Sequence, residues 1–452
     1  MDFVQIKKRL DGLIEDGRRS ELRGALRVLK EVDIAEYLGT LDNERVLMVF
    51  RLLPKDISAD VFSYMDSDQR ARLMEALGDN EAIRLFDEMF VDDAVDLLEE
   101  LPAGLVKRML ERCDEEKRRL INQFLRYPEN SAGSIMTIEF METKLGGTVG
   151  DTLADIRKTG LDKETIYTLY VIDDVRRLVG TLQLSRLLAA DDADRIDPLT
   201  DTKVVSVNTL DDQEHVADIV RRYDLLSVPV VDTEGRLIGI ITADDIMDVI
   251  EEENTEDFEK MAAMLPSEST YIKTSVFTLA KNRFPWLLFL MLSATLTGMI
   301  ITHYENALVA WGALGVALIS CIPMLMDTGG NCGSQSATLA IRGLALGEIG
   351  MKDLFVILWK EVRVATLVGI ALSLVNFARL MFVTRIGFGV SLIVSIAMFF
   401  TILIAKSVGA TLPIAAKWLK FDPALMASPV ITSIVDACSL LILFALATNL
   451  LG

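Results

Sequence analysis

Five long apolar stretches between residue 285 and the C-terminus restrict the possible folds of this chain more than any other feature of its sequence. Stretches of about 18 residues or more match the hydrocarbon core of a bilayer, which is about 30 Å thick. We therefore predict a transmembrane domain of five α-helices, and an odd number of spans places its two ends on opposite sides of the membrane. The predicted spans are residues 285–302, 307–326, 354–380, 386–413 and 424–451.

The charged residues are divided as sharply as the apolar ones. Residues 1–270 contain 59 Asp and Glu against 34 Lys and Arg, a net charge of −25, whereas residues 271–452 contain 7 against 12, a net charge of +5. An acidic soluble part joined to an apolar part excludes a simple soluble enzyme. It also argues against a nucleic-acid partner, because phosphate binding needs basic patches, and it favours cations as ligands.

The basic residues predict an orientation in the membrane. They precede the first span and lie between spans two and three and between spans four and five, and such residues mark the cytoplasmic side. Arg379 and Arg385 fall on the other side and count against this orientation. The first residues also lack the apolar stretch of a signal peptide. We expect a multi-pass protein of the cell membrane, with the acidic domains in the cytoplasm and the C-terminus on the opposite side.

Two carboxylates lie in the apolar part. Asp327 ends the second span, and Asp436 lies well inside the fifth, which contains no basic residue. A charge at such a depth costs several kcal/mol unless it faces a polar cavity or an ion. We expect both carboxylates to lie near a cation path, although a polar contact between two helices is an alternative for Asp436.

A glycine-rich run follows Asp327. Three glycines in five positions weaken a helix, and a broken helix is tolerated in a membrane where it lines a water-filled cavity. We therefore expect an interrupted helix here, whose carbonyl groups and amide side chains offer oxygen ligands to a cation. The alternative is that the glycines allow two helices to pack closely.

The acidic part divides into two regions. Residues 1–130 have apolar residues at helical spacing, in short units of which two begin with Leu-Pro, which predicts an all-α stack of short helices. Further along, the strand-like segments 171–173 and 178–180 match the segments 230–232 and 237–239, at a spacing of 59 residues. A tandem repeat of this length predicts two consecutive α+β units.

Four segments resemble known families. DTEGRLIGIITADD (232–245) resembles the end of a CBS domain. Three others resemble the MgtE magnesium channels: YPENSAGSIMT (127–137), PMLMDTGGNCGSQ (323–335) and the segment 422–436, which begins with Asp-Pro-Ala-Leu. The resemblance covers essentially the whole chain. It implies a helical N domain at 1–130, CBS units at 131–198 and 199–255, a connecting plug helix at 256–280 and the five-helix domain at 281–452.

The same resemblance implies a Mg²⁺-selective channel rather than an enzyme, formed by a homodimer with its pore on the dimer axis. Mg²⁺ gives up its water reluctantly, so a site with few carboxylates and many amide and carbonyl oxygens suits the hydrated ion. Asp436 matches the pore aspartate of the family. The implied ion path comprises Asp436, Asp327, Gly329, Gly330, Asn331, Gln335, Ser428 and Thr432.

Residues 244–259 include nine carboxylates, whose repulsion opposes a compact arrangement unless cations intervene. A solvated charge run, and helix capping for the acids near residue 92, are the alternatives. By resemblance, cytosolic Mg²⁺ binds between the N domain, the CBS pair and the plug helix and closes the pore. The residues implied as its ligands are Asp92, Asp93, Asp245, Asp248, Glu253, Glu256, Asp257 and Asp422.

CBS pairs often bind adenine nucleotides, which suggests a regulatory ATP that is not hydrolysed. Thr242 and Asp245 match ribose-binding positions, and Pro229 lies near the base pocket. Gln183 and Arg186 stand at the corresponding positions of the first unit and depart from the usual pattern. One ATP site per chain is therefore expected.

Two other functions remain open. A broader divalent pathway, for Co²⁺ or Mn²⁺, would favour His or Cys ligands, and Cys332 in the glycine-rich run is the one feature that suggests it. A non-conducting membrane sensor would signal through the N domain to a protein partner. Asp436, buried in the fifth span without a basic partner there, argues against the sensor.

Overall fold

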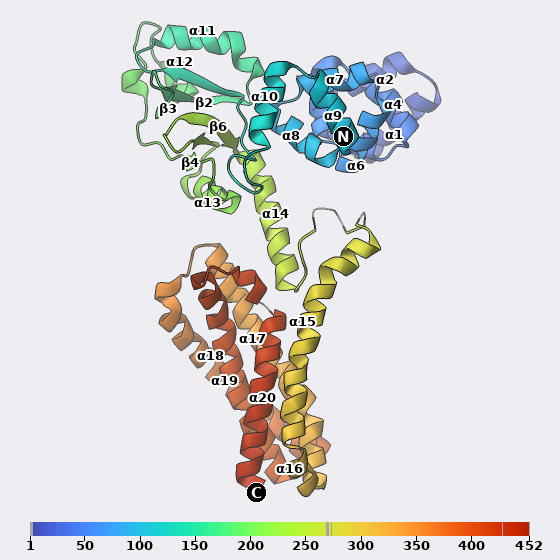
Figure 1. Ribbon diagram of the computed structural model, residues 1–452, viewed down its shortest axis with the longest axis vertical. Coiled ribbons are helices and arrows are strands. Elements are labelled where there is room, and N and C mark those ends of the chain that lie inside the picture. The colour runs from blue at the N-terminus through green and yellow to red at the C-terminus, as the bar shows by residue number, and fades with distance from the viewer. Residues whose placement is uncertain (1–2, 268–270, 273, 427, 452) are drawn as a thin grey trace. The chain divides into compact units, whose positions relative to one another are not determined.

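The computed structural model describes residues 3–267, 271–272, 274–426 and 428–451. The chain forms two compact units, Met1–Ile250 and Glu251–Gly452, each of which is described separately (Figure 1). The division falls inside one helix, α14, so its first residues belong to the soluble unit and its last to the membrane unit.

Among the described residues, the soluble unit begins with ten short helices. The first two pack against each other, and from α3 onward each helix packs against the next but one along the chain, for example α4 against α6 and α5 against α7. The Leu-Pro pairs fall where expected, with Pro54 and Pro102 immediately before α5 and α9. The all-α prediction for this region is confirmed. The helices are α1 (Phe3–Glu15), α2 (Arg19–Leu26), α3 (Glu31–Gly39), α4 (Asn43–Phe50), α5 (Lys55–Ser63), α6 (Ser67–Ala76), α7 (Asp79–Glu88), α8 (Val91–Glu100), α9 (Ala103–Arg112) and α10 (Glu115–Phe124).

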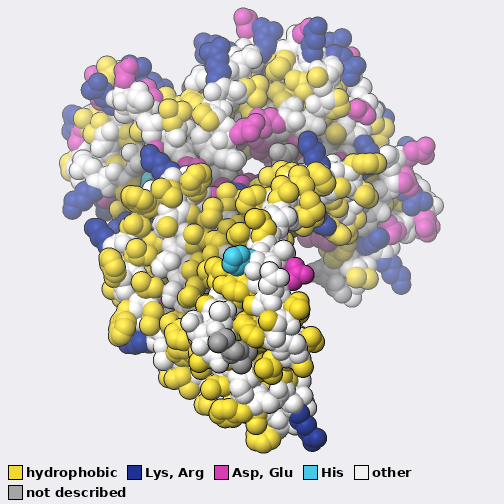
Figure 2. All heavy atoms as spheres, turned by 60° about the horizontal axis from the view of Figure 1, so that its bottom comes forward, with side chains coloured by type: hydrophobic (Ala, Val, Ile, Leu, Met, Phe, Trp, Pro, Cys, Tyr) yellow, Lys and Arg dark blue, Asp and Glu magenta, His cyan; other side chains and the backbone are white. Residues whose placement is uncertain are grey.

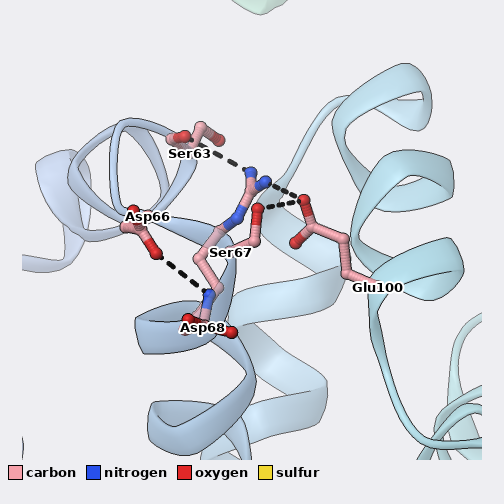
Figure 3. Close-up of polar contacts among 6 residues, drawn as sticks. Ser63, Asp66, Ser67, Asp68 and Glu100 are labelled. Carbon is pink, nitrogen blue, oxygen red and sulfur yellow. Dashed lines mark hydrogen bonds and ion pairs between the residues drawn. The ribbon is translucent and has the colours of Figure 1, made fainter. Parts of the chain in front are cut away.

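A polar network fastens α6 to its neighbours (Figure 3). The Arg70 guanidinium pairs with Glu100 at the end of α8 and donates to the Ser63 carbonyl at the end of α5, at 3.4 Å. Ser67 donates to the same Glu100 carboxylate at 2.8 Å. Asp66 caps α6, since its carboxylate accepts the Asp68 backbone N–H at 3.2 Å. The charge-assisted pair of Arg70 and Glu100 holds α8, and with it the acids of its first turn, in a fixed register against α6.

The second part of the soluble unit has two three-stranded sheets of the same topology. In each, the first two strands are parallel and the last two antiparallel, in the order β1-β2-β3 and β4-β5-β6. The predicted repeat is confirmed. Its elements are β1 (Phe140–Lys144), α11 (Val149–Thr159), β2 (Thr165–Ile172), β3 (Leu178–Gln183), α12 (Leu184–Ala189), β4 (Val207–Asn208), α13 (Gln213–Tyr223), β5 (Ser227–Val231), β6 (Leu237–Thr242) and α14 (Ala243–Met261).

The two sheets share a small apolar core and one buried hydrogen bond. Phe140, Tyr170, Leu237 and Ile240 pack together between them. The Tyr170 hydroxyl lies 2.8 Å from the Ser227 hydroxyl, which joins β2 of the first unit to β5 of the second. The two repeats therefore fold as one pair, and Tyr170 of the first repeat is held in place by Ser227 of the second.

The membrane unit contains five helices that are long and apolar enough to cross a bilayer, among the residues described. On the face shown in Figure 2, hydrophobic side chains predominate over this unit, and acidic and basic side chains are most frequent on the soluble unit. The prediction of five spanning helices is confirmed. The elements are α15 (Val276–His303), α16 (Glu305–Ala310), α17 (Ala313–Ala345), α18 (Leu354–Ala378), a π-helical turn (Arg379–Thr384), α19 (Phe388–Trp418) and α20 (Ser428–Leu451).

Two boundaries differ from the sequence prediction. The predicted second span divides into the short α16 and the start of α17, because Gly312 has a positive φ of 56° between them. The connecting helix expected at 256–280 is not a single helix. Instead α14 runs on from the soluble unit to Met261, and α15 begins at Val276, with no helix among the described residues between them.

Candidate functional site

A polar stripe runs along one face of α17. Asp327, Asn331 and Gln335 are spaced four residues apart, so they lie above one another on the helix, and all three are exposed in a single chain. Polar side chains of a spanning helix avoid lipid and face a polar cavity or another protein surface. This stripe therefore marks the face of α17 that a single chain leaves for ions, water or a second subunit.

The expectation of an interrupted helix at the glycine run is wrong. α17 is continuous from Ala313 to Ala345, so the carbonyl groups of Gly329 and Gly330 lie in regular helix rather than in an open loop. The physical reason is packing: a Cβ atom at Gly329 would lie 2.7 Å from side-chain atoms of Thr401 and Val435. The glycines allow α19 and α20 to approach α17 closely, which is the alternative that the sequence left open.

Glycines of α17 and α19 allow close contact where α17 crosses its neighbours. A Cβ at Gly333 would lie 2.6 Å from Ile431 of α20, and one at Gly409 of α19 would overlap the backbone of Gly333. Thr432 is also at this crossing, because its methyl group would lie 3.0 Å from a Cβ at Gly330. The structure therefore brings the glycines and Thr432 together, and the oxygen-bearing side chains of α17 project from another face.

Asp436 lies on α20 next to Val435, the residue that packs against Gly329. It is half-buried, and its Oδ1 atom is buried without a hydrogen-bond partner in the part of the chain described. The side chain of Ser428, the remaining predicted residue of the path, lies outside the described residues. An unpaired carboxylate inside a bundle is costly unless a cation or a second polar surface completes its surroundings.

In the soluble unit, carboxylates from distant segments meet at the first turn of α8. Asp92 has a buried Oδ1 without a hydrogen-bond partner among the described residues, and Asp93 accepts a hydrogen bond from Ser63 at 2.9 Å. Burial raises the pKa of Asp92 well above its usual value, and repulsion by Asp93, Glu139 and Asp245 raises it further. The fold thus brings Asp92 and Asp93 towards the start of α14, and the positive charges of Arg70 and Lys117 only partly offset the rise in the pKa of Asp93.

Asp245 lies in the first turn of α14, where its carboxylate accepts a hydrogen bond from the Thr242 hydroxyl at 2.5 Å. Burial raises its pKa. Pro229 is buried in β5 and pairs with Ile240 of β6, the strand that ends at Thr242. The three residues predicted to bind a nucleotide therefore lie on adjoining strands and on the helix that follows them.

The remaining predicted cation ligands lie further along α14, except Asp422, which precedes α20. Asp248 is exposed and Glu253 half-buried. Lys260 pairs with both Glu256 and Asp422, with N–O distances of 2.7 Å. Burial raises the pKa of Asp257 to about 6, and repulsion by Asp422 adds to the effect. Among the described residues, no group of three or more His, Cys, Asp or Glu side chains is arranged to hold a metal ion.

Comparison with known proteins decides the family. Residues 322–446 match the family profile described as MgtE divalent cation transporter, residues 29–130 match the MgtE intracellular N domain and residues 196–252 match the CBS domain. Magnesium transporter MgtE of Thermus thermophilus is 35% identical over 98% of both chains. The Bacillus subtilis transporter of the same name is 30% identical over 99% of this chain and 98% of its own. This chain belongs to the MgtE family of magnesium transporters.

Two solved structures match the soluble unit. The soluble part of a magnesium transporter is 31% identical, covers 56% of this chain and 99% of its own, and gives a TM-score of 0.53. The cytosolic domain of the Mg²⁺ channel MgtE in complex with ATP is 34% identical, covers 54% of this chain and 99% of its own, and gives a TM-score of 0.52. The helical N domain and the CBS pair of this MgtE chain therefore have the fold expected for the family, which is a family of membrane transporters and not a class of enzymes.

Sequence reasoning missed three charged residues of this MgtE chain that the fold makes important. Glu164, just before β2, has a pKa raised to about 7 by burial and by repulsion from Asp245 and Asp244. Lys260 and the buried Lys406 are positively charged, whereas only carboxylates were expected from the sequence as the charged groups of the proposed cation sites. Lys406 was visible as the one charged residue of the predicted fourth span, but its partners come from other helices and are not evident from the sequence alone.

Proposed function

We propose that this chain is a Mg²⁺-selective channel through which Mg²⁺ enters the cell down its electrochemical gradient. The observation that carries the proposal is the combination of a polar stripe on α17 with the unpaired Asp436 on the neighbouring α20. A single chain leaves Asp327, Asn331 and Gln335 exposed along one face of a helix of the membrane unit. Amide and carboxylate oxygens are the ligands that a hydrated Mg²⁺ ion accepts.

In this proposal two chains form the pore as a homodimer, and Asp436 faces its counterpart across the axis. Two facing carboxylates repel each other, and a divalent cation between them relieves that repulsion. Residues 1–250 lie in the cytosol and the C-terminus on the other side, as the basic residues between the spans indicate.

Regulation by cytosolic Mg²⁺ is proposed to act through the carboxylates at α8 and α14. Support comes from the raised pKa values of Asp92, Asp245 and Asp257, which express first the cost of burying these carboxylates and then their repulsion by neighbouring acids. Mg²⁺ would remove that cost and favour the compact, closed state. Two ions at about a hundredfold their dissociation constants would supply about 5.4 kcal/mol, enough to move a gate from 1:99 to 99:1.

A regulatory ATP is proposed to bind at Thr242, Asp245 and Pro229. The similar cytosolic domain solved in complex with ATP supports this proposal. Asp245 belongs to both proposed sites, so nucleotide and Mg²⁺ binding would influence each other through one carboxylate.

Mg²⁺ uptake into proteoliposomes at a clamped membrane potential tests the channel. We expect uptake that needs neither ATP nor another ion gradient, and a sharp loss of rate or selectivity for Asp436→Ala. Ser433→Ala on the same helix is the matched control, because among the described residues its hydroxyl bonds to the Pro429 carbonyl and to the Ser293 hydroxyl and to no other group. An Asp436→Ala protein that is folded and conducts like the native one would contradict the proposed path.

The description of the matching family as a divalent cation transporter favours one second candidate, a broader divalent pathway. Competition by Co²⁺ and Mn²⁺ in the same uptake assay separates the two. Inhibition only at concentrations well above that of Mg²⁺ supports Mg²⁺ selectivity, whereas equal uptake of labelled Co²⁺ supports the broader pathway.

A further inference from the structure

A lysine side chain is buried inside the membrane unit. Lys406 lies in the middle of α19 and is 5% exposed. Its ammonium group donates to the Ser336 hydroxyl of α17 at 3.4 Å, and Ser336 is itself 2% exposed. A buried ammonium inside a bilayer is costly and is retained where it has a compensating partner and a role.

The compensating partner comes from a third helix. The Ser336 hydroxyl donates to the Glu361 carboxylate of α18 at 2.8 Å while it accepts from Lys406. Ser336 thus bridges a positive and a negative charge, and the three residues join α17, α18 and α19. A pair of opposite charges within a bundle leaves little net charge, whereas removing one member leaves the other uncompensated.

This network lies beside the glycine crossing. Ser336 follows Gly333 by one helical turn, and Lys406 precedes Gly409 by about one turn, so the network is about 5 Å along the helices from the contact between Gly333 and Gly409. Gln335 of the polar stripe is the immediate neighbour of Ser336 in the chain. Successive residues of a helix point about 100° apart, so the network lies on the face of α17 next to the face that carries the stripe.

We propose that Lys406 and Glu361, linked through Ser336, are a charge-compensated pair that sets the electrostatic potential felt by cations along α17. The pair lies beside the path and does not bind the ion. In a medium of low dielectric constant, an uncompensated charge near a divalent cation changes the affinity for that cation by more than about threefold. The inference rests on the ion path along α17 proposed above.

The test is the Mg²⁺ concentration dependence of uptake by full-length protein in proteoliposomes. Glu361→Gln leaves an uncompensated positive charge, so we expect its KM for Mg²⁺ to rise by at least about threefold. Lys406→Met leaves a negative charge, so its KM should fall by a similar factor, whatever happens to the maximal rate. A role in packing alone would not move the two KM values in opposite directions.

The double variant Lys406→Met with Glu361→Gln keeps the proposal testable where a single variant fails to fold. Replacing a buried charge pair by neutral side chains is often tolerated, so we expect it to fold and to have a KM within about twofold of the native value. Lys360→Met, whose native side chain is exposed on α18, is the matched control and should leave KM unchanged.

Three outcomes are distinguishable. Opposite shifts in the single variants and recovery in the double variant support the pair. Native uptake with KM unchanged in every folded variant, or a double variant whose KM departs more than threefold from native, overturns it. Uptake by the native protein is measured before any variant is compared. If folded native protein shows no uptake, the proposed ion path itself is contradicted.

Discussion

The Lys260 ammonium lies 2.7 Å from a carboxylate oxygen of Asp422 and so joins the last turn of α14 to the segment that precedes α20. Asp422 and the second partner of Lys260, Glu256, are both carboxylates predicted to bind Mg²⁺. The Lys260 ammonium thus already neutralises part of the negative charge that Mg²⁺ is proposed to neutralise. This ion pair holds the end of α14 on the membrane unit without any metal.

We predict that Lys260→Gln makes channel closure more dependent on Mg²⁺. Without the ammonium, Glu256, Asp257 and Asp422 repel one another, so the connection at the end of α14 loosens at low Mg²⁺ and tightens when Mg²⁺ binds. A partly exposed pair contributes at most about 1 kcal/mol, so uptake at low cytosolic Mg²⁺ should rise by no more than about fivefold. Single-channel open probability at stepped Mg²⁺ concentrations measures the effect.

Lys260→Arg is the control for that change, because it retains the charge and the reach. Its open probability should follow the native curve at every Mg²⁺ concentration. A Lys260→Gln protein with the native curve would show that the pair does not contribute to closure.

We predict that Gly333→Ala destabilises the membrane unit although alanine is the better helix former. Alanine would lower the free energy of an isolated helix by about 1 kcal/mol. At Gly333 the new methyl group meets Ile431 at 2.6 Å, and overpacking of a tight interface costs about 1–3 kcal/mol. Thermal unfolding in detergent should show a lower Tm, and Mg²⁺ uptake should fall.

Gly298→Ala in α15 tests the explanation, because a Cβ there has no atom within 4 Å. Its Tm should be equal to the native value or higher. If Gly333→Ala behaves in the same way as Gly298→Ala, close packing at the crossing is not the reason for the glycine.

The same glycines show where sequence reasoning succeeds and fails. The five spans and the CBS repeat could be predicted because hydrophobic length and a repeated strand pattern are local properties of the chain. Gly329 and Gly333 could not be interpreted, because a glycine that breaks a helix and a glycine that lets two helices touch look identical in sequence. Lys406 was missed for a related reason, since its partners Ser336 and Glu361 lie 70 and 45 positions away in the sequence.

Asp96 predicts a pH dependence of stability. Burial raises its pKa from 3.8 to about 7, and repulsion by Asp93 adds to the effect. The folded chain therefore binds more protons than the unfolded chain between about pH 4 and pH 7, and this contribution lowers stability as pH rises through that range. Because the Asp96 side chain is exposed, solvent screens much of this effect, and Asp96→Asn should raise the free energy of unfolding by at most about 1 kcal/mol at pH 8 and have little effect at pH 4.

Unfolding of the full-length protein with EDTA, followed at both pH values, measures this difference. Glu75→Gln, an exposed acid on α6, is the control and should change stability by less than about 0.5 kcal/mol at either pH. An equal gain for Asp96→Asn at pH 4 and pH 8 would indicate a packing effect instead of a titration.

The CBS pair predicts one bound ATP per chain. In the second unit the Thr242 hydroxyl and the Asp245 carboxylate are adjacent, whereas in the first unit Arg186 occupies the position of the acid and donates to the Leu199 carbonyl at 3.2 Å. A guanidinium there cannot accept hydrogen bonds from ribose hydroxyls.

Calorimetric titration of the full-length protein should give a stoichiometry of one ATP per chain. Asp245→Ala should weaken ATP binding by about tenfold, because a hydrogen bond to a charged group is lost. Arg186→Ala should leave the affinity unchanged. Two ATP molecules per chain, or equal losses in both variants, would show that the first unit binds nucleotide as well.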